Sequence, residues 1–250
     1  METFAFQGNR LLAALPPADL ERLRPHLALV KLPLGAVLHE PGSQMRHVYF
    51  PVSGLVSLLQ ALADGSVAES AILGNDGCVG TAILLGGGMT PCRAVVQVAG
   101  YAYRIGSDTI LDEFHRSDAL QLTLLRYIQA LITQMSQTVV CNRHHTVEQQ
   151  LCRWLLMSLD RIPGDEIRVT QELISNMLGV RRVGITEAAT ALQRAGLIEN
   201  QRGRITIRDR SKLQARACEC YATVRKETER LLQGLPGARA IVRQRAALQP

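Results

Sequence analysis

The stretch that decides the fold of this 250-residue chain is VTQELISNMLGVRRVGITEAATALQRA, residues Val169–Ala195. Apolar residues recur at helical spacing on both sides of Gly179, which predicts two amphipathic helices. Glycine adopts the left-handed backbone conformation that ends a helix, so the chain can turn sharply at this point. Arg181 and Arg182 then open the second helix as exposed cations, at the end that would enter a DNA major groove. The pattern predicts a helix-turn-helix that binds DNA.

The residues directly after this stretch predict a short basic hairpin. A strand signal begins at Gly196, a hairpin-turn signal covers Asn200–Gly203, and the segment Arg204–Arg208 alternates with period two. A helix-turn-helix followed at once by a hairpin is a winged helix, whereas the alternative is an ordinary helical hairpin with a surface loop. The side chains expected to contact DNA are Thr170, Gln171, Arg181, Arg182, Thr186, Glu187, Arg202 and Arg204. Arg202 and Arg204, at the hairpin tip, are placed to contact phosphate.

Charge is distributed unevenly along the chain. Residues 1–150 carry 10 Lys and Arg against 12 Asp and Glu, and residues 151–250 carry 18 against 10, which gives the net charge of +6. A basic C-terminal part indicates a polyanionic partner for that part alone. The N-terminus lacks a basic start and an apolar run, and no apolar stretch is long enough to span a bilayer. We therefore expect a cytoplasmic protein with no membrane partner, whose six scattered cysteines stay reduced.

The segment from about Val30 to Ile105 is punctuated by glycine-containing turns such as Ser53-Gly54, and a short helix is predicted before it at Pro17–Leu27. Short strands are expected at Val37-Leu38, Val48–Phe50, Leu55–Leu59, Ala68–Leu73 and Ala94–Val98. Several short strands at near-regular spacing predict an antiparallel sandwich or barrel-like roll.

A long uninterrupted helix is predicted after the strands, because the run from Asp118 to Val140 contains neither glycine nor proline. Its seam of apolar residues, spaced by three and four, consists of Leu124, Ile128, Leu131 and Met135. The seam either packs on the protein's own sheet or pairs with a second copy of the helix. Leu122, Leu125 and Ile132 beside the seam are also apolar, so we expect both contacts, with the four seam residues in the interface of a homodimer.

Two further helices complete the C-terminal part, at Val147–Leu159 and Ser211–Leu232, and a frayed basic tail begins at Gly234. These patterns divide the chain into four parts. We expect a β-roll domain with an N-terminal helix in residues 1–117, for which the family resemblance described below implies a sensor role. We expect a dimerisation helix and hinge in residues 118–145, a winged-helix DNA-binding domain in residues 146–233, and a flexible basic tail in residues 234–250.

The hinge contains Cys141 and His145, which share one face of a helix at four-residue spacing, an arrangement that suits a metal ion. A structural zinc needs four ligands, however, and no second pair lies nearby in the sequence. Cys218 and Cys220, two residues apart on a predicted helix, point to nearly opposite sides and do not readily share a ligand. The alternative is a polar hinge without metal. We favour this interpretation and predict no metal site and no cofactor.

In the order roll, long helix and winged helix, the chain resembles the Crp/Fnr superfamily of transcription regulators over about residues 10–230. In the predicted roll the resemblance rests on Leu34–Gly42 and His47–Gly54. There a strand glycine and a turn glycine precede an apolar and aromatic strand that ends in Ser-Gly. The resemblance implies an α+β fold with an N-terminal antiparallel β-roll of the cyclic-nucleotide-binding type, a long dimerisation helix and a C-terminal winged helix-turn-helix.

The resemblance also implies roles in DNA recognition. Arg182 lies where relatives place a base-contacting arginine, whose fork matches the two acceptors of guanine. Arg181 would lie nearer to the DNA backbone. Val183 stands where relatives commonly carry glutamate, so the preferred half-site should differ from theirs. The partners that the resemblance implies are double-stranded DNA, a second copy of the chain and RNA polymerase.

Cyclic-nucleotide-binding relatives hold the ribose with a Gly-Glu-Leu triplet and the cyclic phosphate with an Arg-Ser-Ala triplet. The matching positions here are Gly80-Thr81-Ala82 and Cys92-Arg93-Ala94. A threonine cannot replace a carboxylate that accepts hydrogen bonds from a ribose diol, so cyclic AMP is not expected to bind. The candidate residues for another effector are Gly80, Thr81 and Arg93, with Arg93 facing an anionic group, and the identity of that effector stays open.

Other cofactors and enzymatic chemistry are not indicated. The chain has no cysteine before Cys78, whereas iron–sulfur relatives carry an N-terminal cysteine cluster, and no histidine is marked as a haem ligand by its context. The glycine run Gly86–Gly88 lacks the ending of a phosphate-binding loop, and Asp112 and Glu113 complement a helix dipole. We therefore expect a non-enzymatic transcription regulator that binds a palindromic site sequence-specifically as a homodimer. The alternative is a scaffolding or DNA-binding protein without sequence preference, which uses its roll for protein contacts.

Overall fold

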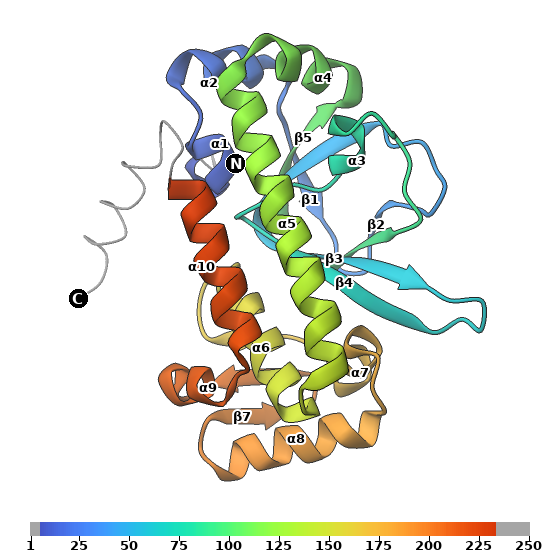
Figure 1. Ribbon diagram of the computed structural model, residues 1–250, viewed down its shortest axis with the longest axis vertical. Coiled ribbons are helices and arrows are strands. Elements are labelled where there is room, and N and C mark those ends of the chain that lie inside the picture. The colour runs from blue at the N-terminus through green and yellow to red at the C-terminus, as the bar shows by residue number, and fades with distance from the viewer. Residues whose placement is uncertain (1–5, 234–250) are drawn as a thin grey trace.

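The computed structural model describes residues 6–233, and the predicted tail from Gly234 onward lies outside the described residues. Figure 1 shows a β-sheet part at one end of an elongated molecule and the helix-turn-helix part at the other. One long helix, α5 (Asp118–His144), runs alongside both parts. This order of sheet, long helix and helix-turn-helix confirms the predicted α+β fold.

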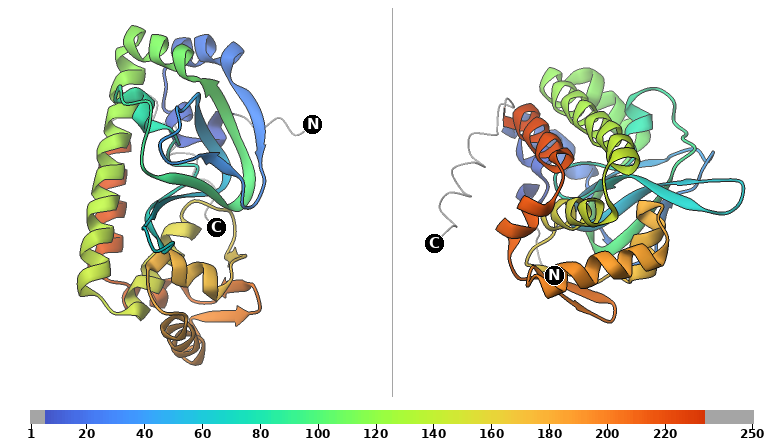
Figure 2. Two further views of the ribbon diagram at one scale, coloured as in Figure 1. Left: turned by 90° about the vertical axis from the view of Figure 1, so that its right-hand side faces the viewer. Right: turned by 60° about the horizontal axis from the view of Figure 1, so that its bottom comes forward.

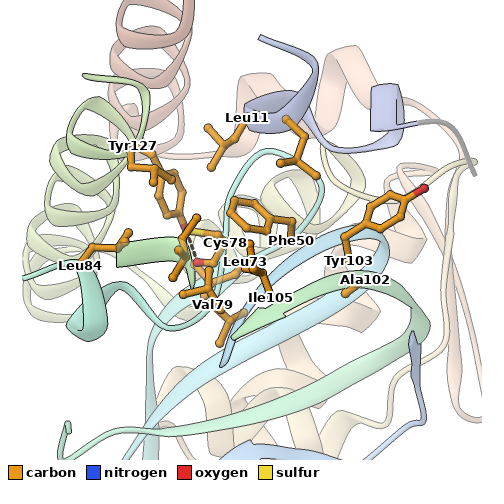
Figure 3. Close-up of a cluster of buried hydrophobic side chains, with 14 of the residues drawn as sticks. Leu11, Phe50, Leu73, Cys78, Val79, Leu84, Ala102, Tyr103, Ile105 and Tyr127 are labelled. Atoms are coloured by element: carbon orange, nitrogen blue, oxygen red, sulfur yellow. Dashed lines mark hydrogen bonds between the residues drawn. The ribbon is translucent and has the colours of Figure 1, made fainter. Parts of the chain in front are cut away.

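The N-terminal part is built around an antiparallel sheet, as the spacing of short strands predicted. Its strands are β1 (Ala28–Leu32), β2 (Val37–His39), β3 (His47–Ala61), β4 (Val67–Leu73) and β5 (Arg93–Gly106). They pair in the order β1-β5-β3-β4, and β2 also pairs with β5. The main core forms between this sheet and α5, where Phe50, Leu73 and Ile105 pack together (Figure 3). The Tyr127 hydroxyl of α5 donates a hydrogen bond of 2.9 Å to the carbonyl oxygen of Cys78, which fixes the helix to the sheet.

Strand β3 runs through Ser53-Gly54, which the sequence predicted to be a turn between two strands. The pairing of β3 with β5 shifts register at several points between Pro51 and Val56, and Gly54 has a φ of 81°. A β-carbon on the facing Gly100 would collide with the backbone of Ser53. The two glycines therefore allow two long strands to bulge and bend around the core instead of ending.

Short helices close the ends of the sheet. They are η1 (Phe6–Gly8), α1 (Arg10–Ala13), α2 (Pro17–Leu23), η2 (Arg24–His26), α3 (Thr81–Leu84) and α4 (Ser107–Arg116). The buried Asn9 caps α1 by accepting hydrogen bonds from the amides of Leu11 and Leu12. Its amide group also donates to the carbonyl oxygens of Pro51 and Gly77, at 2.8 and 2.9 Å. One polar side chain thus holds the N-terminal helices on the sheet.

Helix α5 is present as predicted, but it turns the predicted seam inward. The seam residues Leu124, Ile128 and Leu131 are buried in the core of their own chain, and Met135 packs against the same core. A helix that lies on a sheet buries whichever apolar seam faces that sheet. The predicted packing of the seam on the sheet is therefore confirmed. The burial of Leu124, Ile128 and Leu131 corrects the other half of the prediction, in which they also face a partner.

The C-terminal part contains the helix-turn-helix and the hairpin that the sequence predicted. Its elements are α6 (Val147–Leu159), β6 (Glu166–Ile167), α7 (Gln171–Leu178), α8 (Arg182–Arg194), β7 (Ile198–Gln201), β8 (Arg204–Ile207), α9 (Arg210–Arg216) and α10 (Glu219–Gln233). The strands form a small antiparallel sheet in the order β6-β8-β7.

The predicted helix Ser211–Leu232 is in fact two helices. Helix α9 ends at Arg216, Ala217 has an extended backbone, and α10 begins at Glu219. Helix α10 then turns back and packs along α5, as Figures 1 and 2 show, and Leu232 reaches the main core. The break contains neither glycine nor proline, so helical spacing in the sequence did not reveal it.

A buried carboxyl group fastens α6 to the sheet. The Trp154 indole donates a hydrogen bond of 3.1 Å to Oε1 of Glu69, and the Ser57 hydroxyl donates to Oε2 of the same group. Burial raises the pKa of Glu69 to about 7, although both hydrogen bonds act in the opposite direction. The contact between the two parts of the molecule therefore includes a group that titrates near neutral pH.

A second polar contact connects the end of α6, the turn after β4 and α5. The buried Arg161, just after α6, forms an ion pair of 2.9 Å with Asp76 and donates a hydrogen bond of 3.1 Å to Oε1 of Gln134. Leu55 and Ile72 of the sheet are buried in the same apolar cluster as the core of the helix-turn-helix. The C-terminal part thus packs directly on the sheet part in this structure.

Candidate nucleic-acid interface

The sharp turn of the helix-turn-helix follows from the residues at its helix ends. The Thr170 hydroxyl accepts a hydrogen bond of 3.2 Å from the amide of Leu173, which caps the start of α7. Gly179 ends α7 with a φ of 64°, a conformation that residues with a β-carbon rarely adopt. Arg181 has an extended backbone and directly precedes α8. The two helices are therefore joined by only three residues.

The apolar faces of the two helices determine which side chains point outward. Ile174, Met177 and Leu178 of α7 belong to one buried cluster with Ile185 and Leu192 of α8. Ala188 and Ala189 of α8 are buried as well. Four of the predicted DNA-contacting residues are exposed: Arg182, Thr186 and Glu187 of α8, and Arg181 directly before it. Figure 1 shows α8 along the outer end of the molecule, on the side away from the β1–β5 sheet.

Three of the predicted DNA-binding arginines are exposed and not neutralised. Arg181, Arg182 and Arg202 form no ion pair with any carboxylate of residues 6–233. Arg204 differs, because it lies 3.4 Å from Glu166 and also bonds to the side chain of Gln201. Exposed arginines without a carboxylate partner are available to phosphate oxygens or to the acceptors of guanine.

A surface hollow of about 380 Å³ brings four of the predicted residues together. Thr170 and Gln171 from the start of α7, Arg182 from α8 and Arg202 from the hairpin all line it. The Thr186 hydroxyl, one turn along α8, donates a hydrogen bond of 2.8 Å to Oε1 of Gln171. Residues from three separate elements therefore form one polar surface around the exposed end of α8.

The same hollow includes side chains that the sequence did not single out. Asn200 and Gln201 line it, although the sequence assigned this segment only a role as a turn. The amide of Asn200 donates to the side chain of Gln193, so the hairpin is tied to α8. The signal that could have found them is their sequence position, because Asn200 and Gln201 are polar residues that directly precede the predicted phosphate-contacting Arg202.

The three predicted effector residues lie at the ends of two elements of the sheet part. Gly80 precedes the four-residue helix α3 with a φ of 107°, and Thr81 is the first residue of that helix. Arg93 begins β5 and forms an ion pair with Glu40, with donor–acceptor distances of 2.8 and 2.6 Å. This hydrogen-bonded guanidinium lowers the pKa of Glu40. The predicted anion-binding arginine is thus neutralised by a carboxylate within the chain.

The hinge brings together four residues that the sequence separated. Ligand atoms of Cys141, His145, Cys218 and Cys220 all lie within 4.8 Å of one another. Cys218 lies in the break before α10 and Cys220 in its first turn, so both side chains are buried on the same side. This corrects the prediction that the two cysteines point apart, which assumed that both lie within one continuous helix.

Comparisons with known proteins agree with this arrangement. The family model of the cyclic nucleotide-binding domain matches residues 29–117, and that of the Crp-like helix-turn-helix domain matches residues 149–216. No curated protein sequence matches the chain. Within residues 6–233, no helix combines the length and the apolar character needed to cross a membrane.

Several solved structures share the fold at low sequence identity. The c-di-GMP responsive global regulator CLP of Xanthomonas campestris is 16% identical with a TM-score of 0.61, over 77% of this chain and 99% of that one. FixK2 from Bradyrhizobium japonicum is 14% identical with a TM-score of 0.64, over 77% and 98%. A regulator of the CRP family from Thermus thermophilus is 16% identical with a TM-score of 0.64, over 75% and 96%.

The two domains, their order and the helix-turn-helix together define a class of protein. The chain belongs to the Crp/Fnr superfamily and is a DNA-binding transcription regulator.

Proposed function

We propose that this regulator recognises a palindromic DNA site sequence-specifically, as a homodimer. The supporting observation is the outer surface around the start of α8. There Arg181 and Arg182 are exposed beside Thr186 and Glu187, and neither arginine pairs with a carboxylate of residues 6–233. An arginine fork at Arg182 matches the two acceptors of guanine in the major groove, and the neighbouring Arg181 and Arg202 suit phosphate.

A second exposed surface supports the homodimer. On the outer face of α5, Leu125, Ile132 and Val139 recur every seven residues and are 44, 58 and 70% exposed. Helix α5 lies along one side of the molecule in Figure 2, and none of the helices and strands of residues 6–233 covers its outer side there. Apolar residues in a heptad are typical of paired helices, and a long exposed stripe is unfavourable in water. Two-fold symmetry through this stripe implies half-sites about one helical turn apart.

The remaining parts of the proposal follow from the superfamily and from the sensor positions. Residues 1–117 form the sensor, residues 118–145 the dimerisation helix and hinge, and residues 146–233 the DNA-binding domain. The protein works in the cytoplasm without catalysis and contacts RNA polymerase at promoters. Its effector is not cyclic AMP, because Thr81 offers no carboxylate to a ribose and Arg93 is already paired with Glu40.

Selection of binding sites from a random DNA library tests this function with the full chain. We expect a palindromic motif for the wild type. For Arg182→Ala we expect a loss of about 1–3 kcal/mol in binding and a relaxed preference at one base pair of each half-site. Arg194→Ala, at the other end of α8, is the matched control and should return the wild-type motif. An unchanged motif and affinity for Arg182→Ala would contradict the assignment.

The basic charge of the C-terminal part also suits a binder without sequence preference. A salt titration with the selected site and with random DNA distinguishes the two functions. If the protein contacts only phosphate, its affinity for the two DNAs is the same and decreases equally with increasing salt. A sequence-specific regulator retains tighter binding to the selected site at every salt concentration.

A further inference from the structure

Four side chains with metal-binding chemistry converge where α5 ends and α10 begins. Cys141 lies in the last turn of α5, and His145 is the residue that ends this helix. Cys218 and Cys220 come from the start of α10, which lies at the same level of the molecule (Figure 1). All three cysteines are buried, and the His145 side chain is only 13% exposed. Titratable side chains usually lie on the protein surface, so a cluster of four such residues with this degree of burial is uncommon.

The distances between the ligand atoms fit a single tetrahedral ion. The Sγ atoms of Cys141 and Cys218 are 3.5 Å apart, and Sγ of Cys220 lies 3.6 Å from Nδ1 of His145. Zinc, with Zn–S of about 2.3 Å and Zn–N of about 2.0 Å in a tetrahedron, separates two sulfurs by about 3.8 Å and a sulfur from a nitrogen by about 3.5 Å. Both pairs agree with this geometry within a few tenths of an ångström.

The partner of His145 is a second and independent observation. Its Nε2 atom lies 3.3 Å from Oε1 of Glu219, on the side of the ring away from Cys220. Histidine ligands of zinc almost always donate their other N–H to a carboxylate, a carbonyl or water. Glu219 therefore holds the tautomer in which the lone pair of Nδ1 faces the three sulfurs.

A buried arginine supplies a third observation. Arg153 of α6 is 4% exposed and donates a hydrogen bond of 2.6 Å to the Thr138 hydroxyl. Its buried Nε atom has no hydrogen-bond partner in the described part of the chain. Across residues 6–233, no carboxylate forms an ion pair with it. Three thiolates and a neutral histidine around a divalent ion carry a net charge of −1. Arg153 bonds to Thr138, which lies one turn before Cys141 on α5, so its cation is placed to balance that charge.

A disulfide explains the same residues less well. The Sγ atoms of Cys141 and Cys218 would have to approach to about 2.05 Å, and this bond would leave Cys220, His145 and Glu219 without a role. From the geometry we propose that Cys141, His145, Cys218 and Cys220 bind one zinc ion. All four positions are filled by the protein, which is typical of structural rather than catalytic zinc.

The position of the site indicates what the ion does. Cys141 and His145 belong to the hinge between α5 and α6, whereas Cys218 and Cys220 connect α9 of the winged-helix part to α10, which packs on α5. The ion therefore ties both chain connections between the long helix and the winged-helix part. An effect of the ion on operator binding rests on the proposed function. The binding of zinc by these four residues does not.

The metal content of the full-length protein tests the site directly. The chain is expressed with zinc in the medium, purified without chelator under reducing conditions, and analysed by plasma mass spectrometry. We expect one zinc per chain in the wild type and in Cys92→Ser, a half-buried cysteine outside the cluster. Cys218→Ser and Cys220→Ser should lose most of it. Glu219→Gln should keep the ligands but weaken zinc affinity about tenfold in a chelator competition.

Two further measurements do not depend on how well the variants fold. Cobalt added to the chelator-treated wild type should give the absorption of a tetrahedral thiolate complex, which zinc then abolishes. Chelator should also lower the melting temperature of the wild type, and zinc should restore it. The proposal is overturned if the reconstituted wild type holds no zinc, if Cys220→Ser holds as much, if the protein contains iron with visible absorption, or if peptide mapping finds a Cys141–Cys218 disulfide. None of these measurements involves DNA, so a failure of sequence-specific binding leaves their result intact.

Discussion

Glu69 is a carboxyl group that the fold removes from water while providing two hydrogen-bond donors, Ser57 and Trp154. Burial prevails over these donors and raises its pKa from 4.5 to about 7. Between these two values the folded chain binds more protons at this site than the unfolded chain. The free energy of unfolding therefore falls as the pH rises through this window, and the loss is complete above the folded-state pKa.

Replacing Glu69 with glutamine should remove this pH dependence, because the amide is neutral throughout and still accepts the hydrogen bond from Trp154. We expect the wild type to lose up to about 3 kcal/mol relative to Glu69→Gln between pH 4.5 and pH values above 7. Urea unfolding of both proteins at several pH values and one protein concentration measures the difference. The control is Glu40→Gln, an exposed carboxyl group in the same part, whose difference from wild type should stay constant above pH 5. Parallel curves for wild type and Glu69→Gln would contradict the role of Glu69.

Helix α5 carries two apolar seams that are offset by one residue. The seam through Leu124 and Ile128 packs on the sheet, and the stripe through Leu125 and Ile132 faces solvent. Both have spacings that suit helix packing, so periodicity alone did not decide which of them lies against the sheet. The orientation is fixed by contacts across the fold, such as the hydrogen bond from Tyr127 to Cys78.

Charged residues in the exposed stripe should separate the proposed dimer. Ile132→Glu combined with Val139→Glu should give a monomer in sedimentation at micromolar concentration, with much weaker operator binding, because four carboxylates would meet in the interface. Gln214→Glu with Ala215→Glu, two exposed positions on α9, adds the same charge elsewhere and should remain dimeric. A wild-type chain that sediments as a monomer at this concentration would exclude the dimer itself.

Whether an element could be predicted from the sequence depends on whether the residues that determine it are close together in the sequence. The helix-turn-helix was predictable because its caps, its turn glycine and its apolar faces all lie within Val169–Ala195. The bulge at Gly54 depends on its neighbour β5, and the cysteine–histidine cluster joins residues 77 positions apart. Local signals in the sequence therefore predicted the helix-turn-helix and its exposed residues, whereas contacts between distant segments were visible only in the structure.

Across the whole molecule, the sheet part and the helix-turn-helix part are held in one arrangement by two polar contacts. Trp154 bonds to Glu69 of the sheet, and Arg161 pairs with Asp76 in the turn after β4. An effector changes operator binding only if it binds two arrangements of these parts with different affinity. Arg93 is paired with Glu40 and so does not offer a free cation to the cyclic phosphate. Thr81 does not offer the carboxylate that usually accepts hydrogen bonds from the ribose.

Titration calorimetry of the full chain with cyclic AMP should accordingly give no binding heat at micromolar concentrations of nucleotide. Operator affinity should be the same with and without the nucleotide. Micromolar binding together with tighter operator binding would show that the pocket works despite its altered residues. Arg93→Ala then serves as the control for an anionic contact, because it removes the cation and leaves the α3 segment unchanged.

The apolar cluster that crosses from the sheet into the helix-turn-helix limits how regulators of this kind can be recombined. Leu55 and Ile72 belong to the same buried cluster as side chains of the DNA-binding part, among them Trp154. A chimera that joins this winged helix to the sensor of a distant relative would place unmatched surfaces there and leave Glu69 or Trp154 without its partner. Such an exchange would lower the free energy of unfolding, because it leaves an unfilled cavity and an unsatisfied buried polar group, each on the order of 1–3 kcal/mol. A functional hybrid therefore has to transfer Leu55, Glu69 and Ile72 together with the winged helix, so that the transferable unit extends across the domain boundary.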